Sequence, residues 1–510
     1  MTGELLHDSL RTSAEAAPDK DAVVDEYGRR THSELFDDAF RFARALQDEG
    51  LHRGDRVVLY LDNTAACSAA IFGVLMAGGV FTVVNSQTKA AKLAYVLDDS
   101  EASILVTEAH SADVAAAAVA KANASTVQRV YGVGDDLPAA FAGFRETIES
   151  TAGKPIDPGT APSDLATLVY TSGTTGRPKG VMLSHESLVF TIGSIAEYLR
   201  LEPGDRILSV LPMAFTYGLS QLLLTARLGA TLLLERSFTF PAKTLKRMRD
   251  EKATVFPAVP TVYVTIAGMS HEAPYASVRC LTNAAADLPP AFHERLRVVF
   301  PEAALYRMYG LTECVRVCYL EPALVEQKPT SVGKAIPRTE ALVLDERAQP
   351  VKAGEVGVLH ARGPHVMMGY WRAPELTAHM LRESPGGRML CTHDHFTVDE
   401  DGDLYFVDRS DDIIKTRGEK VSTVEVEGAL HDIPGVRQAA VVGVPDELLG
   451  QAVRAYVVLE EGAVMGEQEL IRACRARIEN FMVPREVVLV SELPLTESGK
   501  VRKRDLTEQT

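Results

Sequence analysis

A chain of 510 residues is long enough for about three folding units of ordinary size, so it can bury a core without disulfides or metals. Hydrophobic residues make up 46% and charged residues 24% of the chain, a balance that excludes a disordered or fibrous protein. Because 69 acidic residues face 53 basic ones, the net charge is −16, and this excess disfavours nucleic acid and anionic lipid surfaces as partners.

The sequence carries no pattern of export or membrane insertion. Glu4, His7 and Asp8 interrupt the only early apolar residues, so no signal-peptide core forms. No apolar run reaches the roughly 18 residues of a membrane span, and the longest, 222–234, is broken by Arg227. Six scattered cysteines without a CxxC pair fit a reducing compartment. We therefore expect a cytoplasmic protein without a membrane span.

Short apolar runs alternate with amphipathic helical patterns along the first 330 residues. Residues 33–49 repeat apolar side chains at helical spacing and predict a helix. The runs that predict strands are 56–61, 102–106, 166–170, 206–211 and 253–257. Alternating strands and helices predict βαβ units with parallel sheets.

The pattern changes twice in the last third of the chain. Glycines and prolines punctuate short strands between residues 329 and 408, which predicts a β-rich part. The remaining chain has the order strand, helix, strand, strand, helix, strand, which predicts a small α+β unit. We therefore expect an N-terminal core over residues 1–410 and a C-terminal domain over residues 411–510.

The most informative segment is a loop that follows a predicted buried strand at 165–170. Its glycines let backbone N–H groups approach an anion, its hydroxyls add donors, and Lys179 adds positive charge. These groups suit a polyphosphate, although the spacing differs from the Walker A loop and a plain turn between strands is the alternative. The loop residues expected to contact the ligand are Thr171, Ser172, Gly173, Thr174, Thr175 and Gly176.

This loop and the downstream string Tyr309-Gly-Leu-Thr-Glu313 resemble the AMP-forming acyl and aryl adenylate ligases. That superfamily includes acyl-CoA synthetases, peptide-synthetase adenylation domains and luciferases, and the resemblance spans about residues 20–504. It implies an α/β fold with a large N-terminal domain of two parallel-type sheets plus a small β-barrel. A small, mobile α+β C-terminal domain follows.

The resemblance also implies a nucleotide site. Tyr309 and Gly310 would lie on one face of adenine, and the small residues Ala284, Ala285 and Ala286 on the other. Thr312 would reach the α-phosphate or the acyl oxygen, and Glu313 would be a hard oxygen ligand for Mg²⁺. Asp394 and Arg409 match residues that contact the ribose.

One position departs from the family pattern. His393 stands where the family usually has glycine, immediately before Asp394. Glycine adopts a positive φ readily and histidine does so less readily. The replacement of glycine by histidine therefore puts the local backbone geometry in question.

Three C-terminal positions also match the family. Asp411 matches the hinge, and Gly418 matches the loop that lines the pantetheine tunnel. Lys500 matches the catalytic lysine that bridges the carboxylate and the α-phosphate. An ammonium suits that position because the two reacting groups are both anionic.

The acid pocket is expected to include Phe215, Thr216, Ser220, Cys314 and Arg316. Thr216 replaces the aspartate that pairs with an α-ammonium in amino-acid-activating relatives, which disfavours an α-amino acid as the substrate. For Arg316 two interpretations stay open: a surface position, or a ligand for a second carboxylate or a phenolate.

The implied reaction has two halves. A carboxylate attacks Mg-ATP to give an acyl-adenylate and pyrophosphate, and after rotation of the C-terminal domain a thiol displaces AMP. The thiol is that of CoA or of a carrier protein's phosphopantetheine. One alternative is the activation of another oxyacid, such as nitrous acid, for an amine acceptor. The other alternative is an inactive nucleotide-binding scaffold, which the presence of Lys500, Glu313 and Asp394 disfavours.

Overall fold

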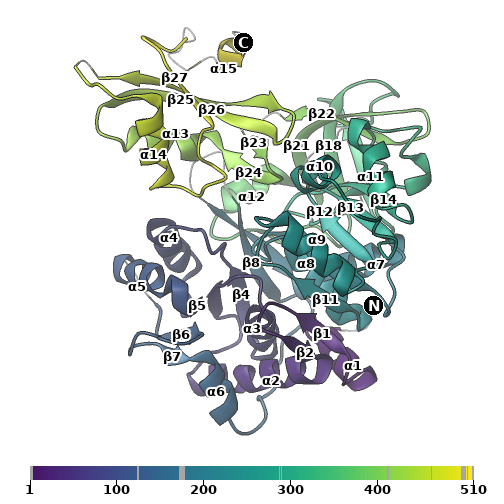
Figure 1. The fold of residues 1–510 in the computed structure, drawn as a ribbon, viewed down its shortest axis with the longest axis vertical. Coiled ribbons are helices and arrows are strands. Elements are labelled where there is room, and N and C mark those ends of the chain that lie inside the picture. The colour runs from purple at the N-terminus through teal and green to yellow at the C-terminus, as the bar shows by residue number, and fades with distance from the viewer. Residues whose placement is uncertain are drawn as a thin grey trace.

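The structure, a computed structural model, describes residues 4–122, 126–171, 178–285, 288, 290–384, 386–409, 413–460, 462–494, 501 and 503–507. They form two large mixed sheets, a small antiparallel sheet and a separate C-terminal sheet. Figure 1 shows the C-terminal strands and helices (yellow) at one end of the long axis, beyond the N-terminal elements (purple to teal). The expected α/β fold with a large N-terminal and a smaller C-terminal domain is confirmed.

The first large sheet is parallel in its centre, from β14 to β1, because helices return the chain to the same edge between its strands. Antiparallel strands close both of its ends. In spatial order its strands are β16 (Lys334–Ala335), β15 (Cys318–Leu320), β14 (Ala304–Tyr309), β13 (Cys280–Asn283), β12 (Val255–Ala258), β10 (Arg206–Ser209), β11 (Thr231–Leu234), β1 (Asp21–Val24) and β2 (Arg29–Thr31).

The second large sheet is parallel from β8 to β7 and antiparallel at the β19–β9–β8 end. In spatial order its strands are β19 (Gly369–Tyr370), β9 (Lys179–Ser184), β8 (Leu165–Thr171), β4 (Val80–Val83), β3 (Arg56–Tyr60), β5 (Ala102–Glu108), β6 (Arg129–Val133) and β7 (Ala142–Gly143). Each of the five strand-like runs predicted within the first 330 residues overlaps a strand of one of these two sheets.

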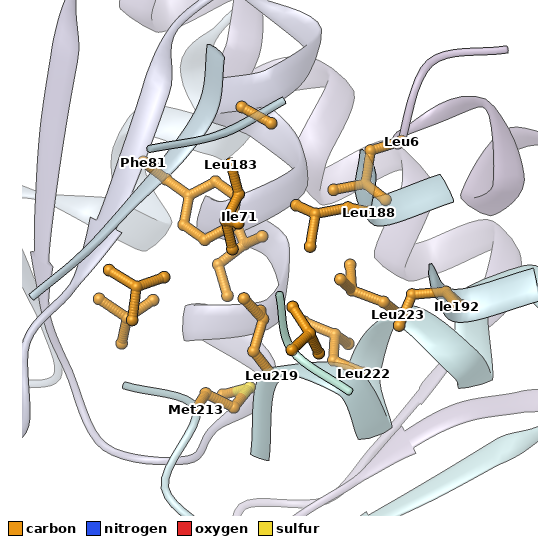
Figure 2. Close-up of a cluster of buried hydrophobic side chains, with 14 of the residues drawn as sticks. Leu6, Ile71, Phe81, Leu183, Leu188, Ile192, Met213, Leu219, Leu222 and Leu223 are labelled. Atoms are coloured by element: carbon orange, nitrogen blue, oxygen red, sulfur yellow. The ribbon is translucent and has the colours of Figure 1, made fainter. Parts of the chain in front are cut away.

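One hydrophobic core joins the two large sheets. It includes Ile207 from the first sheet and Phe81 from the second. Figure 2 shows Leu188 of α7 (His185–Tyr198) and Leu222 of α8 (Thr216–Leu228) among the side chains gathered there, with Ile71 of α3 (Ala65–Met76). The buried apolar faces of these helices therefore fix the two sheets relative to each other.

The other helices follow the alternation that the sequence predicts, and the helix expected at 33–49 is α2 (His32–Asp48), begun by a Thr31 capping box. The remaining helices are α1 (Asp8–Ala16), α4 (Ala90–Ser100), α5 (Ala112–Lys121), α6 (Phe144–Ser150), α9 (Pro241–Asp250), α10 (Pro260–Gly268), α11 (His293–Val299), α12 (Pro374–Met380), α13 (Thr423–His431), α14 (Glu467–Arg475) and α15 (Lys503–Thr507). Short 3-10 segments are Ala109–Ser111, Pro290–Phe292 and Pro322–Leu324. No helix in the described parts of the chain is long and apolar enough to cross a membrane.

The β-rich part is an antiparallel five-stranded sheet. Among its described strands no pairing joins the two ends of the sheet into a closed barrel. Its strands are β17 (Glu340–Leu344), β18 (Gly357–Arg362), β21 (Met389–Val398), β20 (Leu381–Arg382) and β22 (Leu404–Arg409).

The C-terminal sheet has its own hydrophobic core, drawn from residues 414–487. The pattern predicts one strand before its first helix, but the structure has a hairpin of two, because Arg417 and Gly418 both adopt a positive φ and turn the chain. Its strands are β24 (Glu419–Ser422), β23 (Ile413–Thr416), β26 (Gly450–Leu459), β25 (Val436–Asp446) and β27 (Glu486–Leu489). All six cysteines of the chain are buried and free.

Candidate active site

A cavity lies beyond the carboxyl ends of strands from both large sheets, where ligands bind in open parallel sheets. Thr171 at the end of β8 lines it, as do residues 211–212 and 214–218 after β10 and Ala284 and Ala285 after β13. The C-terminal domain closes one side of it with residues 418–420. Segments that are far apart in the sequence therefore line the same cavity.

The loop that joins β14 to β15 carries several of the predicted residues. Its two ends are tied by a 2.9 Å hydrogen bond from the Val317 N–H to the Tyr309 carbonyl. A Cβ on Gly310 would lie 2.5 Å from the Val315 carbonyl oxygen, so the loop folds back on a glycine that cannot carry a side chain without displacing backbone. This closure holds Tyr309, Glu313 and Arg316 on a single short segment.

Tyr309 is directly linked to the predicted ribose ligand. Its hydroxyl donates a 2.6 Å hydrogen bond to Oδ2 of Asp394, a side chain with 1% exposure, and its ring meets Phe396 edge-on. The strand register places Arg409 opposite Asp394, while the side chain of Arg409 is outside the description. The aromatic face and the carboxylate expected for a nucleoside thus lie next to each other.

His393 adopts a backbone conformation that glycine takes more readily than histidine. Its φ is +56°, in the left-handed region, and its ring stacks on that of His379 with 4.8 Å between ring centroids. The ring contact offsets part of the cost of a positive φ at this position.

Glu313 has a partner that the sequence did not reveal. Tyr370 donates a 2.7 Å hydrogen bond to Oε1 of Glu313, and the ammonium of Lys179 lies 5.3 Å from the centre of the Tyr370 ring. Tyr370 is positioned by pairing with Val181 of β9. The adjacent aromatic residues Tyr370 and Trp371 were the available sequence signal, but nothing local connects them to Glu313.

The Glu313 carboxylate fits a Mg²⁺ site that is completed by a nucleotide. It is 7% exposed, and no cluster of three protein ligands in the described part of the chain includes it. Magnesium in phosphate-transfer sites is commonly held by one or two carboxylates with substrate phosphates and water. A single buried glutamate is therefore the donor set expected for an ion that arrives with its nucleotide.

The predicted acid-pocket residues divide into two groups. Phe215, Thr216 and Arg316 line the cavity. Ser220 and Cys314 are buried outside its lining: the Ser220 hydroxyl donates to the Thr216 carbonyl oxygen at 2.5 Å, and burial raises the pKa of the Cys314 thiol well above its ordinary value. The structure thus brings three of the five candidates to the cavity.

Part of the predicted site lies outside the described residues. Thr171 and Lys179 flank the phosphate loop and pair across β8 and β9, and Thr312 lines the cavity. The predicted residues that are not described are Ser172, Gly173, Thr174, Thr175, Gly176, Ala286, Asp411 and Lys500.

Gly418 brings the C-terminal domain against the cavity. It has a φ of +81°, and a Cβ there would lie 2.4 Å from Cγ1 of Val259. Val259 precedes α10 and also lines the cavity. The hairpin therefore seats on the large domain through a contact that only glycine allows.

Lys92 of α4 joins the two domains by charge. Its ammonium lies 2.8 Å from Oε1 of Glu425 and 3.1 Å from Oε1 of Glu479, which also accepts a 3.2 Å hydrogen bond from the Thr88 hydroxyl. Burial lowers the pKa of Lys92, but the two carboxylates outweigh it and raise that pKa above its ordinary value. Burial, helped by Glu479, raises the pKa of Glu419 to about 8. Lys92 is thus the shared counter-ion of two carboxylates of the C-terminal domain.

Comparison with known proteins decides the family. The AMP-binding enzyme family matches residues 10–371, and the AMP-binding enzyme C-terminal domain matches residues 425–500. The chain belongs to the AMP-binding enzymes, the AMP-forming ligases.

The relatives named here match 93% or more of the length of this AMP-forming ligase. A long-chain-fatty-acid–CoA ligase of Bacillus subtilis (strain 168) is 32% identical over 100% of this chain and 95% of its own length. A feruloyl-CoA synthase of Amycolatopsis is 33% identical over 93% of each chain. The solved structure of the Bacillus subtilis o-succinylbenzoate CoA synthetase bound with a product analogue matches with a TM-score of 0.85, at 25% identity and 99% coverage of both chains.

Replacing Gly418 by alanine is expected to slow the second half-reaction of this AMP-forming ligase about 10-fold, because the new Cβ meets Val259 and the positive φ becomes strained. Adenylate formation should keep its rate. Single-turnover assays of each half-reaction measure both effects. Gly428→Ala, in α13 with open space around the new Cβ, is the matched control. Equal losses in both half-reactions would contradict this role for Gly418.

Replacing Lys92 by methionine leaves Glu425 and Glu479 without their shared counter-ion. We expect the seated arrangement of the C-terminal domain to weaken and thioester formation to slow about 10-fold, since breaking a partly buried pair costs more than breaking an exposed one. Small-angle scattering and the thioester rate measure this change. The exposed neighbour Lys89→Met is the control, and unchanged scattering and rates for the Lys92 variant would refute the prediction.

Proposed function

We propose that this ligase activates a carboxylic acid with ATP, releases pyrophosphate, and transfers the acyl group from AMP to the thiol of coenzyme A. The observation that carries the proposal is the convergence of Thr171, Thr312 and Gly418 on the wall of one cavity. The buried residues Tyr309 and Glu313 flank its lining residues 310–312, and Tyr309 is hydrogen-bonded to Asp394. The names of the relatives, which are CoA ligases and synthases, support an acid–thiol ligase.

In the first half-reaction the protein holds the nucleotide and neutralises charge. Tyr309 would stack on adenine while Asp394 accepts hydrogen bonds from the ribose hydroxyls. Glu313 would hold Mg²⁺, which supplies charge neutralisation at the phosphates. Lys179, Thr312 and Lys500 would donate to the oxygens on which negative charge accumulates as the carboxylate attacks the α-phosphorus.

In the second half-reaction the C-terminal domain presents a different face to the site. Rotation about Asp411 would carry Lys500 away and bring Gly418 to the cavity wall. The contact of Gly418 with Val259 supports this assignment, because both residues line the cavity. The incoming thiolate would then attack the acyl carbonyl, and AMP would leave.

The lining of the cavity favours an aryl or acyl acid over an α-amino acid. Phe215 and Tyr217 provide aromatic walls, and Thr216 offers no negative charge for an α-ammonium group. Coenzyme A is favoured over a carrier protein as the acceptor, because a chain with a net charge of −16 repels an acidic carrier.

A product assay by mass spectrometry tests the proposal. The protein is mixed with Mg-ATP and a panel of aryl, fatty and small carboxylic acids, each with and without CoA. We expect AMP, pyrophosphate and one acyl-CoA. An acyl-AMP that persists despite CoA would assign a carrier protein as the acceptor. The absence of AMP with every carboxylic acid would refute acid activation and leave a non-carboxylate oxyacid, such as nitrous acid, as the substrate to test.

Lys500→Ala should abolish adenylate formation and spare thioester formation from supplied acyl-AMP, because the ammonium serves only the first half-reaction. Pyrophosphate exchange measures the first half and acyl-CoA release measures the second. Lys246→Ala, a lysine with 77% of its side chain exposed, controls for the loss of a positive charge. An equal loss of both half-reactions would refute the role of Lys500.

A further inference from the structure

Arg316 is a buried cation in the wall of the cavity. It is 2% exposed and lies two residues before β15. Its place in the closed β14–β15 loop is fixed by a 2.6 Å hydrogen bond from its own N–H to the Cys314 carbonyl oxygen. The surface position that the sequence left open for Arg316 is therefore excluded.

No carboxylate of the described residues is paired with Arg316, although Glu419 and Glu479 of the C-terminal domain line the same cavity. Throughout the described parts of the chain no carboxylate oxygen lies within 4.0 Å of its guanidinium, and its Nε has no hydrogen-bond partner there. Glu313, three residues earlier, directs Oε1 to Tyr370. Its side-chain contacts are with two neutral tyrosines: the centre of the Tyr217 ring lies 5.3 Å from the Arg316 Cζ, and a side-chain hydrogen bond links Arg316 to the buried Tyr198.

The Tyr217 ring is a weak partner for a buried guanidinium. Its hydroxyl is already engaged, since it donates to the Thr282 carbonyl oxygen at 2.7 Å. An arginine cannot lose its proton to escape burial, and a buried charge is costly unless an anion faces it. A cation–π contact is weaker than a carboxylate in that position. The cavity at Arg316 is therefore built for an anion that the described protein does not supply.

A second positively charged side chain lies in the wall of the same cavity as Arg316. Lys420, from the C-terminal hairpin, lines the same cavity, and its charge and that of Arg316 both act to lower the pKa of Cys314 against the effect of burial and Glu313. The two domains thus each contribute a positive charge near this loop.

We propose that the substrate carries a second carboxylate, and that Arg316 binds it while the first carboxylate is activated by ATP. This inference rests on the proposed function and names the substrate class for the same cavity. A guanidinium fork matches the two oxygens of a carboxylate, and a carboxylate is fully ionised near neutral pH whereas a phenol is not. Phe215 and Val259 favour an apolar spacer, aryl or alkyl, between the two acid groups.

The first experiment uses the wild-type enzyme with paired substrates. Alkyl dicarboxylic acids of increasing length and benzene dicarboxylic acids are each compared with their own monomethyl esters in AMP-release assays. We expect kcat/KM for the best diacid to exceed that of its monoester on the order of 100-fold, the scale of a buried charge pair. A monoester or a neutral hydroxyaryl acid that is used as well as the diacid would overturn the inference.

The second experiment uses variants of the same position. Arg316→Met should lose about 100-fold in kcat/KM for the diacid, mostly through KM, while its activity on the monoester stays within a few-fold. Arg316→Lys should retain an intermediate preference, because it keeps the charge and loses the fork. Arg297→Met, with 52% of the Arg297 side chain exposed, is the control. Equal losses for diacid and monoester would overturn the inference, because they would place Arg316 at the reacting carboxylate or in the folding of the loop.

The wild-type comparison decides the inference even if the Arg316 variants do not fold. Activity on monocarboxylic acids with no preference for diacids overturns this inference and leaves the proposed function standing. The absence of AMP with every carboxylic acid overturns the proposed function itself.

Discussion

The arrangement of the candidate active site depends on the β14–β15 loop, which connects three sheets. Through the Tyr309–Asp394 hydrogen bond it ties the first large sheet to the small antiparallel sheet, and through the Glu313–Tyr370 hydrogen bond it ties both to the second large sheet. Both bonds are to buried carboxylates, and hydrogen bonds to an ionised acceptor are stronger than those between neutral groups. These two bonds therefore help to fix the relative positions of three sheets next to the cavity.

The sequence predicts local secondary structure and motifs, but it does not predict contacts between residues that are far apart in the chain. The strands and the helix α2 follow from apolar spacing. The family motifs mark Tyr309, Glu313 and Asp394 as candidate site residues, because those residues stand within recognisable strings. Tyr370 and Lys92 were missed, because their partners lie 57 or more residues away and no pattern at their own positions records the contact. A contact of this kind becomes visible only when the strands have been paired.

The predicted acid pocket shows that sequence position alone does not tell which residues line the cavity. Sequence position alone groups Ser220 and Cys314 with Arg316, but helix and loop geometry turn the first two away from the cavity and leave Arg316 in its wall. At His393 the local backbone preference fails as a guide. Histidine rarely adopts the left-handed conformation, yet the surrounding strand and the His379 ring hold His393 in it. Tertiary contacts overrule a local preference at that position.

The burial of every cysteine has a consequence for side reactions. An acyl-adenylate is a mixed anhydride that any accessible thiolate attacks, so an enzyme that makes one beside its own nucleophiles risks acylating itself. Burial raises the pKa of each thiol, which keeps these sulfurs protonated as well as hidden. The cysteines are Cys67, Cys280, Cys314, Cys318, Cys391 and Cys474. An activated acyl group formed in this cavity would therefore meet the thiol that enters from solvent before it meets one of the protein's own.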